Sequence, residues 1–164
     1  MTSDSRKLPI EIPLTGLLDI AFDAMIAEFR TELEKSEFKD IRPTHGCVFR
    51  FVKDGGGLRL TEIAERANMT KQSVGEIVDD LAARGYVKRV PDPDDRRAKL
   101  ICLTERGEEA QAYGFRLFAE VEERWAERYG AERIASLRET LEEITLVEAP
   151  YAVPELSHAE PVGA

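Results

Sequence analysis

Five polar residues at the start of one predicted helix have side chains that suit contact with nucleic acid. They are Thr70, Lys71, Gln72, Ser73 and Glu76. Glutamine can bind adenine through two hydrogen bonds, lysine can bind phosphate or guanine, and a helix N-terminus itself favours phosphate. A solvent-exposed helix start is the competing interpretation, and the first four residues alone favour it. Glu76 either accepts a hydrogen bond from a cytosine amino group or faces solvent, because a carboxylate repels phosphate.

A second group of charged residues occupies a turn rich in proline and aspartate. It consists of Asp95, Arg96, Arg97 and Lys99. An arginine at the tip of such a turn can enter a narrow A·T minor groove. Asp95 can hold Arg97 in place through a bidentate ion pair. The alternative is a charged turn that serves only solubility.

The helix that carries the first group is the second of a closely spaced pair. Residues 60–67 are predicted to form a short helix with Thr61 as its N-cap. Thr70 caps the next helix, which ends at Gly85. Its apolar residues have the spacing of one buried helix face: Val74, Ile77, Val78 and Leu81. Asp79 and Asp80 are expected to pair with arginines or to point away from the groove.

Two short strands, 86–90 and 99–103, flank the arginine-rich turn and make it the loop of a β-hairpin. Pro43 begins an earlier helix, expected to end at Gly55-Gly56-Gly57. Longer helices are predicted at 14–38 and at 105–147, the latter with Thr104 as its N-cap and divided by Gly130. The apolar stripe of the first helix is wider than one neighbour needs, which indicates burial on two sides. Residues 1–13 are predicted to be a flexible arm and 148–164 a tail.

This order of elements predicts a mainly α fold with a small β-hairpin wing. Six helices form a winged helix-turn-helix protein, with a single domain at 14–147 and a DNA-binding lobe at 43–104. The net charge of the 164 residues is −9, but its distribution matters more than its sum. Residues 105–164 hold the excess of acidic side chains, whereas residues 60–104 are balanced. A local cationic patch is therefore compatible with an acidic protein.

Other classes of function have little support. The two cysteines and two histidines lack the spacing of a zinc site. The run Asp92-x-Asp94-Asp95 suggests calcium, but Arg97 and Leu103 stand where an EF-hand needs glycine and glutamate. No P-loop and no nucleophile–base pair is present, so we expect neither an enzyme nor a cofactor. No apolar run could cross a bilayer and no secretory segment is evident, so we expect a cytoplasmic protein without membrane contact.

Several local sequences occur together in one order. They are the helix pair Leu60-Thr-Glu-Ile-Ala-Glu-Arg-Ala-Asn-Met-Thr-Lys-Gln-Ser-Val, the segment Val78-Asp-Asp-Leu-Ala-Ala-Arg-Gly-Tyr-Val, the turn Asp92-Pro-Asp-Asp-Arg-Arg-Ala-Lys, and Leu103-Thr-Glu-Arg-Gly. In this combination residues 58–107 resemble the MarR family of winged-helix transcription regulators. The DPxDRR hairpin followed by LTxxG is the most specific part of the resemblance.

The resemblance implies an intertwined homodimer in which the first and last helices interlock. It also implies a repressor that places its recognition helices in successive major grooves of a pseudo-palindromic operator. Arg97 would then enter the flanking minor groove, with Asp95 orienting it. Glu76 departs from the family, many members of which carry a basic or neutral polar residue there. The alternative is a winged-helix protein-interaction module without specific DNA binding, which the net charge and Glu76 favour.

Regulation by a small aromatic ligand or by thiol oxidation is a further implication of the resemblance. The ligand site would be a crevice between the dimer helices and the DNA-binding lobe. Candidate residues are Phe22, His45, Phe49 and Phe115, although each is more readily explained as core. Cys47 is the candidate for a thiol switch, but burial as a small hydrophobic residue is the favoured interpretation.

Overall fold

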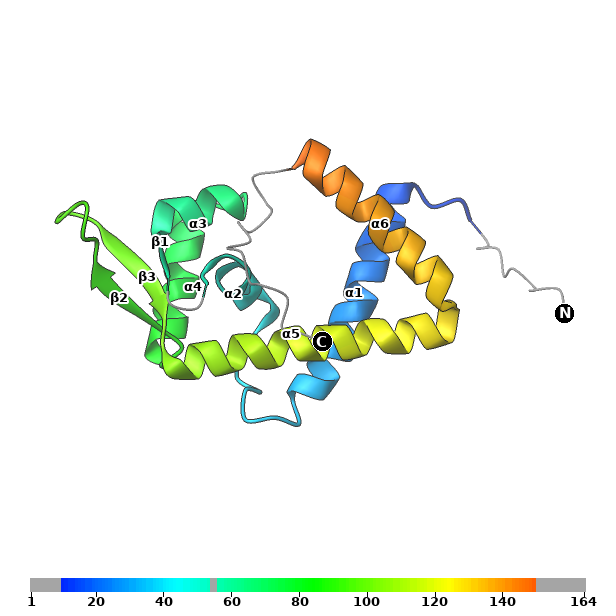
Figure 1. Cartoon of the computed structure of the whole chain (residues 1–164), viewed down its shortest axis with the longest axis horizontal. Helices are drawn as coiled ribbons and strands as arrows, with labels where there is room; N and C mark the ends of the chain where they lie inside the picture. The colour runs from blue at the N-terminus through cyan, green and yellow to red at the C-terminus, as the bar shows by residue number, and fades with distance from the viewer. Residues whose placement is uncertain (1–9, 54–55, 150–164) are drawn as a thin grey trace, which may run out of the picture.

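The computed structural model describes residues 10–53 and 56–149 of the chain. A winged lobe is joined to three long helices (Figure 1). In chain order the elements are α1 (Leu14–Leu33), the 3₁₀ turn η1 (Pro43–His45), α2 (Gly46–Phe51), β1 (Gly57–Arg59), α3 (Leu60–Arg66), α4 (Lys71–Ala83), β2 (Val87–Pro91), β3 (Lys99–Leu103), α5 (Glu105–Tyr129) and α6 (Ala131–Glu148). The predicted mainly α fold with six helices and a β wing is confirmed. Most of the predicted arm and tail, and Gly55, lie outside the described residues.

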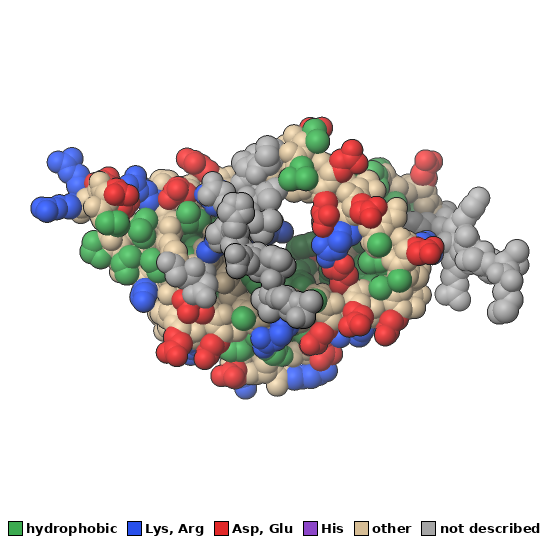
Figure 2. All heavy atoms as spheres, in the orientation of Figure 1, with side chains coloured by type: hydrophobic (Ala, Val, Ile, Leu, Met, Phe, Trp, Pro, Cys, Tyr) green, Lys and Arg blue, Asp and Glu red, His purple; other side chains and the backbone are tan. Residues whose placement is uncertain are grey.

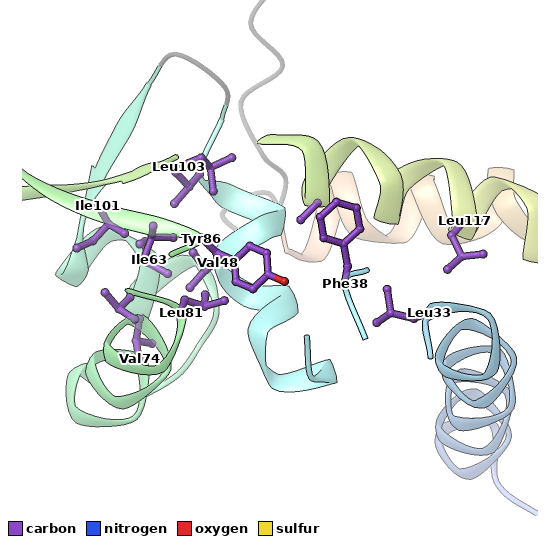
Figure 3. Packing of buried hydrophobic residues seen from close by; sticks show 14 of the residues in the cluster. Leu33, Phe38, Val48, Ile63, Val74, Leu81, Tyr86, Ile101, Leu103 and Leu117 are labelled. Atoms are coloured by element: carbon purple, nitrogen blue, oxygen red, sulfur yellow. The ribbon is translucent and has the colours of Figure 1, made fainter. Parts of the chain in front are cut away.

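The lobe from η1 to β3 has a closed hydrophobic core. Helix α4 turns Val74, Val78 and Leu81 inward, as their helical spacing predicts, and all three are fully buried. The helices α2 and α3 and the sheet complete the cluster with further buried side chains: Val48, Val52, Ile63, Tyr86 and Ile101. In Figure 3 the labelled side chains of this cluster converge between the helices and the sheet: Val48, Ile63, Val74, Leu81, Tyr86 and Ile101. Burial of this kind contributes about 25 cal/mol per Å² of apolar surface, so the core holds α4 firmly in place.

The sheet has three antiparallel strands in the order β1-β3-β2. The predicted hairpin is confirmed, with Val87 opposite Leu103 and Pro91 opposite Lys99. Strand β1 was not predicted, because the glycine run was interpreted only as a connection. Gly57 lies in that strand opposite Cys102, and a Cβ there would come within 2.6 Å of the Cys102 Sγ. Glycine therefore permits the close approach of the two strands.

The helix starts agree with the prediction at α4 and α5 but not at α3. The Thr70 and Thr104 hydroxyl oxygens accept the backbone N–H groups of Ser73 and Gly107. The prediction of Thr61 as N-cap is wrong, because α3 begins at Leu60 and Arg59 takes the N-cap position. The Glu62 carboxylate accepts the backbone N–H of Arg59 at 2.7 Å. This acceptor satisfies the helix start without a hydroxyl cap.

The three long helices lie beside the lobe, and two of them, α1 and α6, bury little of their own apolar surface. α1 packs on α5 through stacked Phe29 and Phe118 rings, whose centroids are 4.0 Å apart. The Trp125 indole N–H also donates to the Glu28 carboxylate at 3.0 Å. α6 folds back from the end of α5, as Figure 1 shows, and none of its residues is buried. In α1 only Phe29 and Leu33 are buried.

Candidate nucleic-acid interface

The N-terminal end of α4 presents two polar side chains to solvent. The Thr70 hydroxyl accepts the Ser73 backbone N–H at 3.1 Å and lies 2.8 Å from the Ser73 hydroxyl. Thr70 and Ser73 therefore complete the helix start, whereas Lys71 and Gln72 extend outward and are exposed. The free backbone N–H groups and the helix dipole favour an anion at this end.

Glu76 lies one turn along the same face and contacts Gln72. The Gln72 amide donates to the Glu76 carboxylate, with 3.3 Å between Nε2 and Oε1. This contact orients the amide so that its carbonyl oxygen is available as an acceptor. Glu76 itself is exposed. The pair combines acceptors at one position, which suits an amino group on a base edge better than a phosphate.

The remaining carboxylates of α4 are neutralised by arginines. Arg89 on β2 donates to Asp79 at 2.7 Å, and Arg84 donates to Asp80 at 3.0 Å. The expectation that these aspartates pair with arginines is confirmed. Their charges therefore oppose an approaching phosphate less than their number suggests.

His45 anchors α4 to the start of α2. Its Nδ1 accepts the backbone N–H of Arg42 at 3.1 Å, and its Nε2 lies 2.9 Å from the Asp80 carboxylate. Since Nδ1 accepts, the proton is on Nε2, which donates to Asp80. The side chain is buried, and this burial lowers the pKa of His45, although the bond to Asp80 partly opposes the effect. His45 is therefore a neutral connector between the two helices.

A second polar cluster joins the end of α4 to the chain before η1 and to α5. The buried Tyr86 hydroxyl donates to Asp40 at 2.6 Å and accepts from Arg106 at 3.1 Å. The Arg106 guanidinium lies over the Tyr86 ring, 4.5 Å from its centroid. Burial, followed by the bond to Asp40, raises the pKa of Tyr86 to about 12. The cluster fixes the segment that follows α4 to the base of α5.

The wing carries exposed cations at its tip. Arg96, Arg97 and Lys99 are exposed, and Figure 2 shows basic side chains gathered at this end of the molecule. Among the residues that the structure describes, neither arginine of the tip forms an ion pair. The predicted bidentate pair is wrong, because the Asp95 carboxylate instead accepts the Arg97 backbone N–H at 3.0 Å. The Arg97 guanidinium is thus available to bind an anion such as a phosphate, or a base edge.

Sequence reasoning did not identify which arginines form the ion pairs that hold these two surfaces in place, and it missed the partner of Asp92 altogether. Arg59 and Asp92 pair across the wing base, and Arg89 and Asp79 pair between wing and helix. Asp92 was considered only as a calcium ligand. Its partner is 33 positions away, so no local motif connects them. The predicted hairpin, which follows α4 directly in the chain, is the one sequence feature that could have indicated that β2 lies near α4.

The predicted ligand pocket stays a prediction. His45 has both ring nitrogens engaged, and Phe49 packs edge-on against Tyr86, with centroids 6.0 Å apart. Phe22 and Phe115 are exposed on α1 and α5. Two hollows on the described surface are lined by other residues: Thr61, Ala64, Glu65, Asn68, Met69 and Lys71 in one, and Arg30, Leu33, Glu34, Lys39, Ile41, Arg42 and Pro43 in the other.

Other sites suggested by the sequence find limited support. Burial raises the pKa of the Cys47 thiol, whose Sγ donates to the Thr44 carbonyl at 3.3 Å. A protonated thiol is a poor nucleophile, which favours the packing role over the redox role. In the described ranges no group of His, Cys, Asp and Glu is arranged to hold a metal ion. None of the described helices combines the length and hydropathy of a membrane span.

Comparisons with known proteins agree with this geometry. Residues 39–98 match the model of the MarR family. The transcriptional regulator HosA of Escherichia coli O111:H- is 29% identical over 96 residues, which are 58% of this chain and 71% of HosA. The HTH-type transcriptional regulator FarR of Neisseria gonorrhoeae is 26% identical over 155 residues, covering 90% of this chain and 97% of FarR.

Solved structures share the arrangement of most of the chain. The transcriptional regulator PA4135 has a TM-score of 0.70 at 25% identity, covering 84% of this chain and 99% of that one. The transcriptional repressor CouR, bound to a 23-mer DNA duplex, has a TM-score of 0.68 at 25% identity, covering 80% and 92%. The match to the family model lies in the winged lobe, and the likeness in fold extends to the long helices. Residues 39–98 therefore carry the MarR family pattern, and the chain is similar in sequence and fold to winged helix-turn-helix transcriptional regulators.

Proposed function

We propose that the protein is a homodimeric, sequence-specific DNA-binding repressor. In this proposal α4 enters the major groove with Lys71 and Gln72 foremost, and Arg97 enters the flanking minor groove. The observation that carries it is the exposed, polar start of α4 together with two exposed wing-tip arginines that have no ion-pair partner among the described residues. CouR, which shares the fold, is a repressor bound to a DNA duplex.

The electrostatics of the lobe support contact with phosphate. Asp79, Asp80 and Asp92 are each paired with an arginine, so three of the carboxylates of α4 and the wing are compensated. Lys71, Arg96, Arg97 and Lys99 are exposed. The acidic excess lies in residues 105–164, away from the helix-turn-helix in sequence. A protein with an overall negative charge can therefore still present a cationic surface to DNA.

The apolar surface of α1 and α6 supports the homodimer. Large apolar side chains on these helices are 38–70% exposed in the single chain: Leu14, Leu17, Leu18, Ile20, Phe22, Leu137, Leu141, Ile144, Leu146 and Val147. An apolar surface of this extent marks an interface. A second copy joined by a two-fold axis would cover it and repeat the DNA-binding surface. Two lobes could then read half-sites about 34–36 Å apart on a pseudo-palindrome.

Fluorescence anisotropy tests the DNA-binding part. An operator is first selected from a random pool of duplexes, and its affinity is then titrated against salt beside a scrambled duplex. We expect specific binding that falls steeply with salt. Arg97→Ala should weaken it about tenfold, whereas Arg116→Ala on α5 serves as a matched control and should change it little. No enriched sequence, with equal weak binding to both duplexes, would instead favour the protein-interaction module.

Release of DNA by a small aromatic ligand is a separate part of the proposal. Exposed Phe22 and half-buried Phe49 offer aromatic surface near the helices that join the lobe. A panel of small aromatic compounds should contain one that releases the wild-type protein from the selected operator at a concentration at which Phe22→Ala remains bound to it. If no compound releases either protein from the operator, the proposed control by a ligand is wrong, although the proposal of DNA binding is unaffected.

A further inference from the structure

Asp92 is a buried carboxylate at the base of the wing that DNA contact alone does not explain. Its side chain is only 5% exposed, which is rare for a charged residue. One oxygen, Oδ1, accepts the backbone N–H of Asp94 at 2.9 Å. The other, Oδ2, lies 2.7 Å from Nε and 2.6 Å from Nη2 of Arg59. Both oxygens of the carboxylate are thus engaged.

Arg59 connects three parts of the lobe at one position. Its backbone ends β1 and pairs with Leu100 of β3. The same residue is the N-cap of α3, where its N–H donates to Glu62. Its guanidinium then reaches Asp92 at the end of β2. A single residue therefore ties the start of the helix-turn-helix to the wing.

The turn of the wing is built on the same aspartate. The Asp92 backbone N–H donates to the Ala98 carbonyl at 3.1 Å, and the Ala98 N–H donates to the Asp95 carbonyl at 2.9 Å. Together with the bond from Asp94, these contacts fold the segment that carries Arg96 and Arg97. Because α3 packs on α4 in the common core, the Arg59–Asp92 contact sets the wing tip against the recognition helix.

We propose that Arg59 and Asp92 form a clamp that positions the wing arginines relative to α4 for simultaneous contact with the minor and major grooves. This inference rests on the proposed function, since it assumes that the wing tip touches DNA. Arg59 and Asp92 are positioning residues and do not themselves contact the duplex. The pKa of Asp92 is lowered, first by the Asp94 N–H and then by Arg59, so the clamp stays ionised at neutral pH.

Two substitutions open the clamp in different ways. Asp92→Asn keeps the size of the side chain and an oxygen for the Asp94 N–H, but it removes the charge that Arg59 binds. Arg59→Lys keeps the positive charge but lacks the fork that places two donors on one oxygen. Asp94→Asn is the matched control. It removes the same charge only two positions from Asp92, but Asp94 is exposed and contacts Asp92 through its backbone N–H, which the substitution leaves in place.

The test compares a full operator with a duplex cut at the outer edges of the two half-sites, which lacks the flanking minor grooves. The ratio of the two affinities measures the contribution of the wing. We expect a ratio of about ten for the wild type and Asp94→Asn, close to one for Arg97→Ala, and strongly reduced for Asp92→Asn and Arg59→Lys. In the double variant Asp92→Asn/Arg97→Ala, the second change should add almost nothing.

Several outcomes would overturn the clamp. Equal loss of affinity on both duplexes would show that Asp92 only stabilises the lobe, as would full additivity with Arg97→Ala. If Asp92→Asn does not fold, Arg59→Lys decides by the same ratio. An Arg97→Ala effect with unchanged ratios in both clamp variants rejects the clamp and keeps the proposed function. A normal ratio in Arg97→Ala rejects the wing contact itself, and the clamp with it.

Discussion

The winged lobe and the α1/α6 pair handle their apolar residues in opposite ways. In the lobe, Val48, Val74 and Leu81 are completely enclosed by side chains of the same chain. In α6 no residue is buried, although Leu137, Leu141 and Ile144 keep the spacing of a packed helix face. The same helical pattern therefore leads to a finished core in one region and an open surface in the other.

This difference indicates that the two regions have different tasks. The lobe is held by its own core and by buried polar links such as His45–Asp80, so it can present a fixed surface to DNA. The apolar face of α1 and α6 is largely exposed within the described chain, and in the proposed homodimer a second copy would cover it. We therefore expect the stability of the lobe core to be independent of protein concentration. Coverage of the apolar face of α1 and α6 should instead increase with protein concentration, because it requires a second chain.

The largest effect is expected from Leu81→Ala in the core of the lobe. Removing a fully buried leucine should lower the free energy of unfolding by about 2–5 kcal/mol. Equilibrium urea unfolding measures this loss, which should be the same at every protein concentration. The comparison is with Leu141→Ala in α6, whose cost should appear only where the dimer forms. If the loss of unfolding free energy in Leu81→Ala varied with protein concentration, the lobe core would not be independent of assembly, and the proposed difference between the two regions would be wrong.

Leu141→Glu should separate assembly from folding. A carboxylate in the apolar face of α6 should keep the chain monomeric, with its helical circular dichroism preserved. Operator affinity should fall about 100-fold, because two linked lobes bind far more tightly than one. Light scattering and anisotropy measure the two effects. Glu139→Lys changes charge on the opposite side of α6 and is the control, and a dimeric Leu141→Glu would contradict the proposed interface.

The lobe, unlike the helices, contains a buried histidine whose protonation should affect stability. Because the pKa of His45 is lowered on folding, the unfolded chain binds more protons, and stability falls as the pH drops. The contribution is complete above about pH 6.5 and is lost as the pH falls through the folded pKa. Thermal unfolding from pH 7 to 5 should show this slope, His45→Gln should flatten it, and His158→Gln should retain it.

The smallest effect is expected from a single cation at the start of α4. If Lys71 binds phosphate, Lys71→Ala should weaken all duplexes alike and reduce the slope of log affinity against log salt by about one unit. Gln72→Ala should instead relax the preference at one base pair. Anisotropy with the selected and scrambled operators distinguishes the two variants. A base-specific loss in Lys71→Ala would assign that residue to the bases.

Local sequence patterns predicted most of the helices and strands of the lobe but few of the side-chain contacts that join them. The spacing from Val74 to Leu81, the caps Thr70 and Thr104, and the proline-aspartate turn each signal one element within a few residues. Strand β1 escaped prediction because three residues including Gly57 give no strand pattern, and its pairing with Cys102 arises only in the folded sheet.

The links between elements could not be predicted for the same physical reason. Arg59 and Asp92 are separated by 33 positions and Tyr86 and Asp40 by 46, so only the tertiary fold brings them together. Arg97 is exposed at the tip of the predicted turn, but the Asp95 carboxylate, its predicted partner, accepts the Arg97 backbone N–H instead of binding the guanidinium. Side-chain partners in a turn depend on backbone geometry that residue types alone do not specify.

The most direct test of the central claim is the mass of the complex with the selected operator. Size-exclusion chromatography with light scattering, at protein in excess over duplex, gives the number of chains bound. We expect two chains on one pseudo-palindromic duplex, and a duplex with one half-site scrambled should bind much more weakly. If one chain binds, with equal affinity for both duplexes, the central claim is contradicted. That claim is a homodimer in which each lobe binds one half-site and the long helices join the two chains.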